Sequence, residues 1–104
     1  MSFNRFKNAC LKYANEKGFK LFPNNSMYLD NIQNSMTEVF DFSFTSSAIK
    51  CYTILKNDDG FIYSDMDFNL AKTFNEFKTI LDDLILNYKK MKMENKINAI
   101  KNDF

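Results

Sequence analysis

Residues 61–68 read FIYSDMDF, and the alternation of side chains along this stretch decides the predicted fold. Successive side chains of an extended chain point to opposite sides. One side then carries Ile62, Ser64, Met66 and Phe68, and the other carries Phe61, Tyr63, Asp65 and Asp67. The first side is suited to a core. The second side combines two aromatic rings with two carboxylates, which suits neither a core nor an ordinary solvated surface.

The same alternation occurs in two earlier stretches. Residues 37–45 read TEVFDFSFT, and residues 48–55 read AIKCYTIL. The sequence KNDDG at residues 56–60 predicts a hairpin turn, because Gly60 readily adopts a positive φ. Short connections favour antiparallel neighbours, so the three stretches are expected to form a three-stranded antiparallel meander.

Helical periodicity precedes these strands. Apolar residues spaced three and four apart predict a helix over residues 3–17, with Ser2 as its N-cap and Gly18 as its end. Ser26 is expected to begin a second, shorter helix before the first strand.

An unbroken heptad stripe follows the strands and predicts a long C-terminal helix. The stripe consists of Leu70, Phe74, Phe77, Leu81, Leu84, Tyr88 and Met91. Either Asn69 caps this helix or Thr73 does, with Glu76 completing a capping box. A helix over residues 70–103 would be about 50 Å long, so residues 92–104 are expected either to project or to fold back as a helical tail.

Together these elements predict an α+β fold of order α(α)βββα, in which the meander packs against the N-terminal and C-terminal helices. The 104 residues are expected to form a single domain, residues 1–104. With 12 phenylalanines and one valine, aromatic rings must fill most of its interior.

Composition excludes several kinds of chemistry. Histidine is absent, which removes Ser–His and Cys–His nucleophiles and histidine metal ligands. The only glycines are Gly18 and Gly60, too few for a phosphate-binding loop. Cys10 and Cys51 occupy apolar positions and are predicted to be buried free thiols in a reducing cytoplasm. No run approaches 18 apolar residues. We therefore predict a cytoplasmic protein that is not an enzyme, without catalytic residues, metal, cofactor or membrane span.

Charge is distributed unevenly although the net charge is only +1. Residues 37–83 carry nine acidic and four basic side chains, while both flanks are basic. If the apolar side of the meander meets the helices, the other side presents tyrosines surrounded by aspartates. The predicted partner-binding residues are Asp41, Tyr52, Asp58, Asp59, Tyr63, Asp65 and Asp67. The alternative is that the first helix covers this side.

Residues 54–77, ILKNDDGFIYSDMDFNLAKTFNEF, place a hairpin directly before a helix entered at TFNEF. This arrangement resembles that of small phage-borne anti-CRISPR inhibitors of αβββα type. The resemblance implies an inhibitor from a mobile element that binds a larger host protein, most specifically a basic, nucleic-acid-binding effector nuclease. Because the net charge is +1, it implies a blocking contact rather than DNA mimicry.

Two alternatives remain open from the sequence. The helix entry at TFNEF also looks like the end of some toxin or bacteriocin immunity domains. The stripe within residues 70–91 would instead allow a homodimer, and the lysines that follow it would suit a dimeric nucleic-acid-binding accessory protein.

Overall fold

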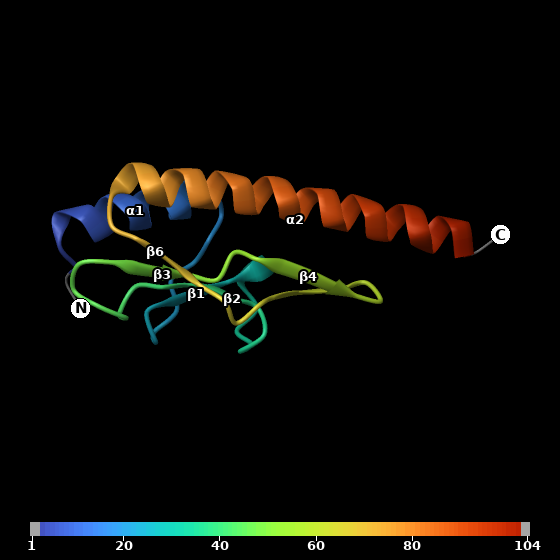
Figure 1. Ribbon diagram of the computed structural model, residues 1–104, viewed down its shortest axis with the longest axis horizontal. Coiled ribbons are helices and arrows are strands. Elements are labelled where there is room, and N and C mark those ends of the chain that lie inside the picture. Colours follow the sequence, from blue (N-terminus) through green and yellow to red (C-terminus); the bar gives the residue numbers. More distant parts are fainter. Residues whose placement is uncertain (1–2, 103–104) are drawn as a thin grey trace.

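A computed structural model describes residues 3–102 and has an α+β architecture, as predicted. Its elements in chain order are α1 (Arg5–Glu16), β1 (Ser26–Tyr28), the 3-10 helix η1 (Leu29–Asn31), β2 (Glu38–Asp41), β3 (Ile49–Cys51), β4 (Leu55–Asp58), β5 (Phe61–Ser64), β6 (Asn69–Ala71) and α2 (Phe74–Asn102). Figure 1 shows the strands on one side of the molecule and the two long helices on the other.

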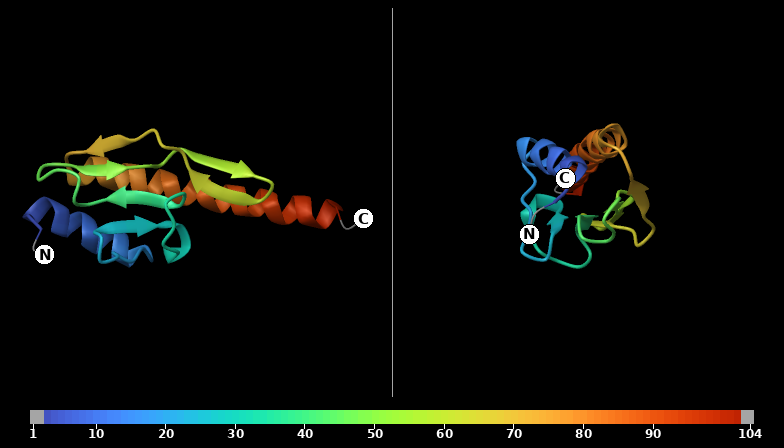
Figure 2. Two further views of the ribbon diagram at one scale, coloured as in Figure 1. Left: turned by 90° about the horizontal axis from the view of Figure 1, so that it is seen from below. Right: turned by 90° about the vertical axis from the view of Figure 1, so that its left-hand side faces the viewer.

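The strands form two antiparallel sheets. One has the order β1-β2-β3-β6, and the other pairs β4 with β5. Because β3 leads directly into β4 and β5 leads back into β6, the two sheets are the two halves of one long hairpin (Figure 2). No strand is assigned at its middle, to residues 52–54 and 65–68. There the Asp65 N–H still donates to the Ile54 carbonyl at 2.7 Å, while the Tyr52 N–H donates to the Val39 carbonyl of the neighbouring strand at 2.7 Å.

The predicted three-stranded meander is not confirmed. β1 adds a strand where a second helix was expected to begin at Ser26, and Phe61–Ser64 pairs with β4 in a separate sheet. Asn25 adopts φ 65° and closes a turn by donating its N–H to the Phe22 carbonyl at 2.8 Å. The Asn25 carbonyl then accepts from the Phe42 N–H at 2.9 Å, which leads the chain along β2. Positive φ at Asp30 and Asn31 prevents a regular helix from following.

The predicted strands are longer than the observed ones. At the end of β2 the Ser43 N–H and hydroxyl both donate to Asp41 Oδ1 at 2.9 Å, so the chain turns before Phe44. The alternation of FIYSDMDF holds only through Ser64. Met66 was predicted to face the core but is 84% exposed.

The core lies between the four-stranded sheet and the helices, which run side by side on the same side of it (Figure 2, right). Phe77 of α2 packs on β2 and its end, with ring centroids 4.9 Å from Phe40 and 5.9 Å from Phe42. Much of the predicted heptad stripe is therefore used within the chain, since Phe77, Leu81 and Leu84 are buried. The homodimer predicted through residues 70–91 would have to expose this core.

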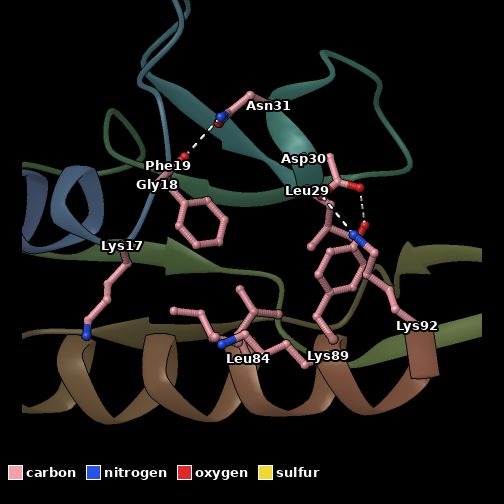
Figure 3. Close-up of a pocket in the computed structure, with 11 residues that line it drawn as sticks. Lys17, Gly18, Phe19, Leu29, Asp30, Asn31, Leu84, Lys89 and Lys92 are labelled. Atoms are coloured by element: carbon pink, nitrogen blue, oxygen red, sulfur yellow. Dashed lines mark hydrogen bonds and ion pairs between the residues drawn. The ribbon is translucent and has the colours of Figure 1, made fainter. Parts of the chain in front are cut away.

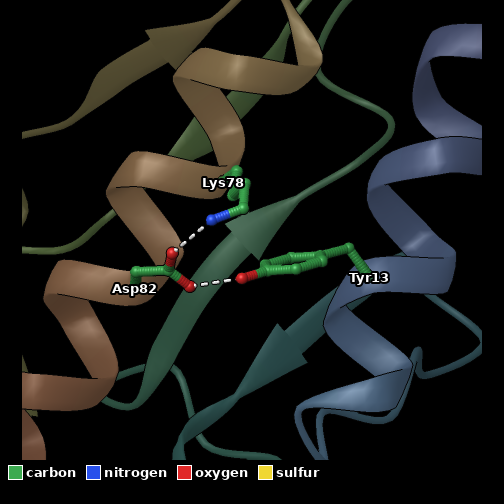
Figure 4. Close-up of polar contacts among 3 residues, drawn as sticks. All are labelled: Tyr13, Lys78 and Asp82. Atoms are coloured by element: carbon green, nitrogen blue, oxygen red, sulfur yellow. Dashed lines mark hydrogen bonds and ion pairs between the residues drawn. The ribbon is translucent and has the colours of Figure 1, made fainter.

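A polar contact holds α1 against α2 (Figure 4). The Tyr13 hydroxyl donates to Asp82 Oδ1 at 2.6 Å, and Lys78 Nζ lies 3.0 Å from Asp82 Oδ2. The Tyr13 ring also meets Phe74 edge-on, with centroids 5.7 Å apart. These contacts place α1 beside α2, so α1 does not lie on the opposite face of the sheet.

The N-terminus of α1 is capped by Asn4, whose Oδ1 accepts from the Lys7 N–H at 2.8 Å. The predicted cap, Ser2, lies outside the described residues. Gly18 follows the helix with φ 97°, as expected for a residue that ends it.

Of the two predicted caps of α2, Thr73 directly precedes the helix. Asn69 belongs to β6. Thr73 Oγ1 accepts from the Glu76 N–H at 3.1 Å, and the Glu76 carboxylate accepts from the Lys72 N–H at 2.8 Å. The helix then continues for 29 residues without folding back, over the sheet and onward along the β4–β5 hairpin (Figure 1). Asn95 fixes the hairpin to it by donating to the Gly60 carbonyl at 3.1 Å.

We expect Phe77→Ala to lower the free energy of unfolding by about 3–5 kcal/mol, because it removes a fully buried ring from between two others. Urea denaturation followed by circular dichroism measures this loss. Phe61→Ala, at a ring that is 45% exposed, is the control and should cost less than about 1 kcal/mol. A loss at Phe77 no larger than that of the control would contradict the packing described.

The contact at Asp82 should make stability depend on pH. Its carboxyl pKa is lowered, chiefly by the hydrogen bond from Tyr13 and then by that from Lys78. The contact therefore stabilises the fold above the unfolded-state pKa, about 4, and loses its effect as the pH falls through the folded-state pKa.

We accordingly expect Tyr13→Phe to lower the melting temperature at neutral pH, with a difference from wild type that narrows on acidification. Thermal melts from about pH 7 to about pH 2 test this. Tyr63→Phe is the matched control, since that hydroxyl has no hydrogen-bond partner among residues 3–102. A Tyr13→Phe difference that stays constant with pH would contradict the assignment.

Candidate functional site

The face of the four-stranded sheet that points away from α1 and α2 is left open by both helices (Figures 1 and 2). Asp41, Lys50 and Leu70 are register partners across β2, β3 and β6, so their side chains lie on one side. Ile49 and Cys51, which flank Lys50 along β3, are fully buried on the helix side. Lys50 and its partners therefore mark the open face.

Three aromatic rings surround Lys50 on this face. Lys50 Nζ lies 4.2 Å from the ring centroid of Phe68, 4.6 Å from that of Phe44 and 5.0 Å from that of Tyr52. The Phe68 ring in turn contacts the other two rings, with centroids 5.9 Å from Phe44 and 6.0 Å from Tyr52. We call Phe44, Lys50, Tyr52, Phe68 and Leu70 the aromatic face.

Each contact between the ammonium and a ring contributes about 0.5–1 kcal/mol at an exposed site. The three contacts join Lys50 and the rings into one packed group. The rings are not sealed from solvent, because Phe44 is 43% and Phe68 45% exposed. The aromatic face is thus an ordered apolar surface in contact with water.

The outer side of the β4–β5 hairpin carries a second, smaller group. Phe61 and Tyr63 stack, with centroids 5.9 Å apart and an interplanar angle of 18°. Their register partners across the hairpin are Asp58 and Lys56. Lys56 Nζ also lies 3.8 Å from Asp65 Oδ2, so this side is both aromatic and charged.

The structure does not gather the seven predicted partner-binding residues into one cluster. Tyr52 belongs to the aromatic face, whereas Tyr63, Asp58 and Asp65 belong to the hairpin side. Tyr52 and Tyr63 are not cross-strand partners, because the register partner of Tyr63 is Lys56.

The remaining three aspartates lie where strands end, turn or are linked. The Asp41 carboxylate is engaged by Ser43 at the end of β2. Asp59, with φ 49°, and Gly60, with φ 94°, form the two-residue turn of the hairpin. Asp67 is exposed in the link to β6, and its N–H lies 3.4 Å from Asp65 Oδ1.

The sequence does not single out Phe44, Lys50 or Phe68 as site residues, because strict alternation from Phe40 and from Ile62 would place both phenylalanines on the core side. Strict alternation ends where the chain turns, at Ser43 and at Asp67. The signal that marks these turns is the aspartate two residues before the turning backbone, Asp41 before Ser43 and Asp65 before Asp67. Each such turn breaks the alternation and moves the following ring to the other face.

The described residues contain no group of three or more acidic or cysteine side chains that could hold a metal ion. Cys10 and Cys51 are free and fully buried, as predicted, and burial raises the pKa of both thiols to about 12. They therefore remain protonated near neutral pH. No helix within residues 3–102 is long and apolar enough to cross a lipid bilayer.

We expect neither cysteine to react with 5,5′-dithiobis(2-nitrobenzoate) at about pH 8 while the protein is folded, because the attacking species is the thiolate. Both should react once urea unfolds the chain. Rapid modification of either thiol in the native protein would show that its side chain is accessible and would contradict the complete burial of Cys10 and Cys51.

The sheet side and the end of α2 have opposite charge. Residues 37–71, which hold β2 to β6, carry six acidic and two basic side chains. Residues 86–102 of α2 carry five lysines and one glutamate. The aromatic face therefore lies in the acidic part of the molecule.

The aromatic face and the adjoining hairpin side form the candidate functional site. Exposed rings on a rigid sheet, with carboxylates nearby, are typical of surfaces that bind other proteins. No protein-family model, curated protein or solved structure matches the chain.

Proposed function

We propose that the chain is a non-enzymatic protein-binding domain that docks on a larger partner through the aromatic face. The observation that carries this proposal is the group of three rings around Lys50 on a sheet face that no helix covers. Aromatic side chains dominate binding hot spots because they bury a large area while losing little conformational freedom.

The order of the aromatic face in the free protein favours binding. Ordering flexible side chains on association costs about 0.5–1.5 kcal/mol for each one. Since Phe44, Tyr52 and Phe68 are already packed around one cation, most of that cost is met on folding. Lys50 thus acts as a positioning residue for the rings.

The charge of the sheet side indicates a basic partner surface. Six acidic side chains against two basic ones in residues 37–71 would attract such a surface and increase its association rate at low salt. The hairpin aspartates Asp58, Asp59 and Asp65 would lie at the rim of the contact, where charges influence the rate more than the affinity.

The narrower form of the proposal is that the chain is an inhibitor encoded by a mobile element, acting in the cytoplasm. It is supported by the resemblance of residues 54–77 to anti-CRISPR inhibitors of αβββα type. In this form the aromatic face covers a basic surface of an effector nuclease that otherwise contacts nucleic acid.

Photo-crosslinking tests the docking surface even before the partner is identified. A p-benzoylphenylalanine placed at position 68 should capture the partner, while the same group at position 86 of α2 should not. Leu86 is a fair control because it is 66% exposed.

Once the partner is captured, Phe44→Ser with Phe68→Ser should weaken binding at least about 30-fold, the loss expected for hot-spot rings. Leu86→Ser with Met93→Ser, two exposed positions of α2, should leave the affinity within about twofold. Equal losses in both double variants, or crosslinks from position 86 alone, would contradict the proposed surface.

The proposed inhibitor role is tested separately, by measuring DNA cleavage. Added to a guide-loaded effector nuclease that it binds, the wild-type protein should reduce cleavage of target DNA, and the Phe44→Ser, Phe68→Ser variant should not. Binding without any loss of cleavage would leave the docking surface intact and refute the inhibitor role.

A further inference from the structure

A cavity of about 410 Å³ lies between the segment after α1, η1 and the middle of α2 (Figure 3). Its volume is within the range of small-molecule sites. Apolar groups line much of it, namely Phe19, Leu29, Leu84, Ile85 and the ring of Tyr88. It shares no residue with the aromatic face.

Basic side chains surround this apolar lining. Lys17, Lys89 and Lys92 line the cavity, whereas Asp30 is its only acidic group. The Tyr88 hydroxyl donates to one Asp30 oxygen, and Lys92 Nζ lies 3.5 Å from the other. Asp30 is thus already engaged. Lys17 Nζ lies 5.4 Å from the ring centroid of Tyr13, but neither Lys17 nor Lys89 forms an ion pair within residues 3–102.

Hydrogen bonds within the chain join the walls of the cavity. Asn31 Nδ2 donates to the Gly18 carbonyl at 2.9 Å, and Asn31 Oδ1 accepts from the Lys20 N–H at 2.8 Å (Figure 3 shows the first of these). These two bonds join the chain after α1 to η1. The cavity therefore does not need to be formed by the molecule that enters it.

We propose that this cavity is a binding site for a small amphipathic anion with an aromatic body. The body would lie against Phe19 and Tyr88, and its anionic group would be held by Lys17 and Lys89. Lysine binds anions as a point charge with no planar match, so sulfonate, carboxylate and phosphate groups are all suitable. The site is independent of the proposed docking surface.

The test uses 8-anilinonaphthalene-1-sulfonate, whose fluorescence rises in apolar surroundings. The folded protein should bind it saturably at one site. N-phenyl-1-naphthylamine has the same rings without the sulfonate and should bind at least about fivefold more weakly, because charge-assisted contacts are lost. Equal affinity for the two probes would overturn the anionic part of the proposal.

Paired variants separate this site from other apolar surfaces. Lys17→Gln with Lys89→Gln should raise the dissociation constant of the sulfonate at least about fivefold. Lys12→Gln with Lys90→Gln removes the same charge from exposed positions of α1 and α2 outside the cavity and should change the dissociation constant less than about twofold. The Phe44→Ser, Phe68→Ser protein should bind like wild type.

Chemical shifts of backbone amides locate the bound probe. The proposal is supported by shifts at Gly18, Phe19 and Leu29, together with a loss of affinity in the Lys17→Gln, Lys89→Gln protein that the Lys12→Gln, Lys90→Gln protein does not show. Absence of saturable binding, an equal loss in the two lysine pairs, or shifts confined to the aromatic face would each overturn it.

Discussion

The packing of Phe77 against Phe40 and Phe42 is the contact on which the rest of the structure depends. It fixes α2 over one face of the four-stranded sheet, and the hydrogen bond from Tyr13 to Asp82 then holds α1 beside α2. Both helices therefore pack on the same face of the four-stranded sheet. On the opposite face the rings around Lys50 contact one another and the ammonium, and Phe44 and Phe68 remain at the surface.

The sequence predicts those parts of the fold that depend on local periodicity. The heptad stripe identifies α2 and its buried side, and the spacing of apolar residues identifies α1. The fourth strand could not be predicted in this way, because the left-handed conformation of Asn25, and not periodicity, leads residues 26–28 along β2. Tyr52 contacts Phe68 because the two chain segments are brought together by strand pairing, and a local sequence pattern does not show which strands pair. Lys7 is a further example: a buried ammonium that donates to the carbonyls of Phe42 and Thr45 cannot be distinguished in sequence from a solvated lysine.

The two candidate surfaces follow from one asymmetry of the fold. The open sheet face is aromatic and lies in the acidic part of the chain, whereas the cavity beside α2 is lined by lysines. A basic protein surface suits the first and a small anion suits the second, for the same electrostatic reason. Because they share no residue, one can be altered while the other is kept.

The central claim is that the sheet has one face sealed by both helices and one face in contact with water. Solvent paramagnetic relaxation enhancement with a neutral gadolinium chelate measures this directly on the phenylalanine ring protons. We predict strong enhancement for Phe44 and Phe68 and almost none for Phe40, Phe42 and Phe77. Protection of Phe44 and Phe68 equal to that of the three core rings would contradict this claim, because something in the chain would then cover the face described as open.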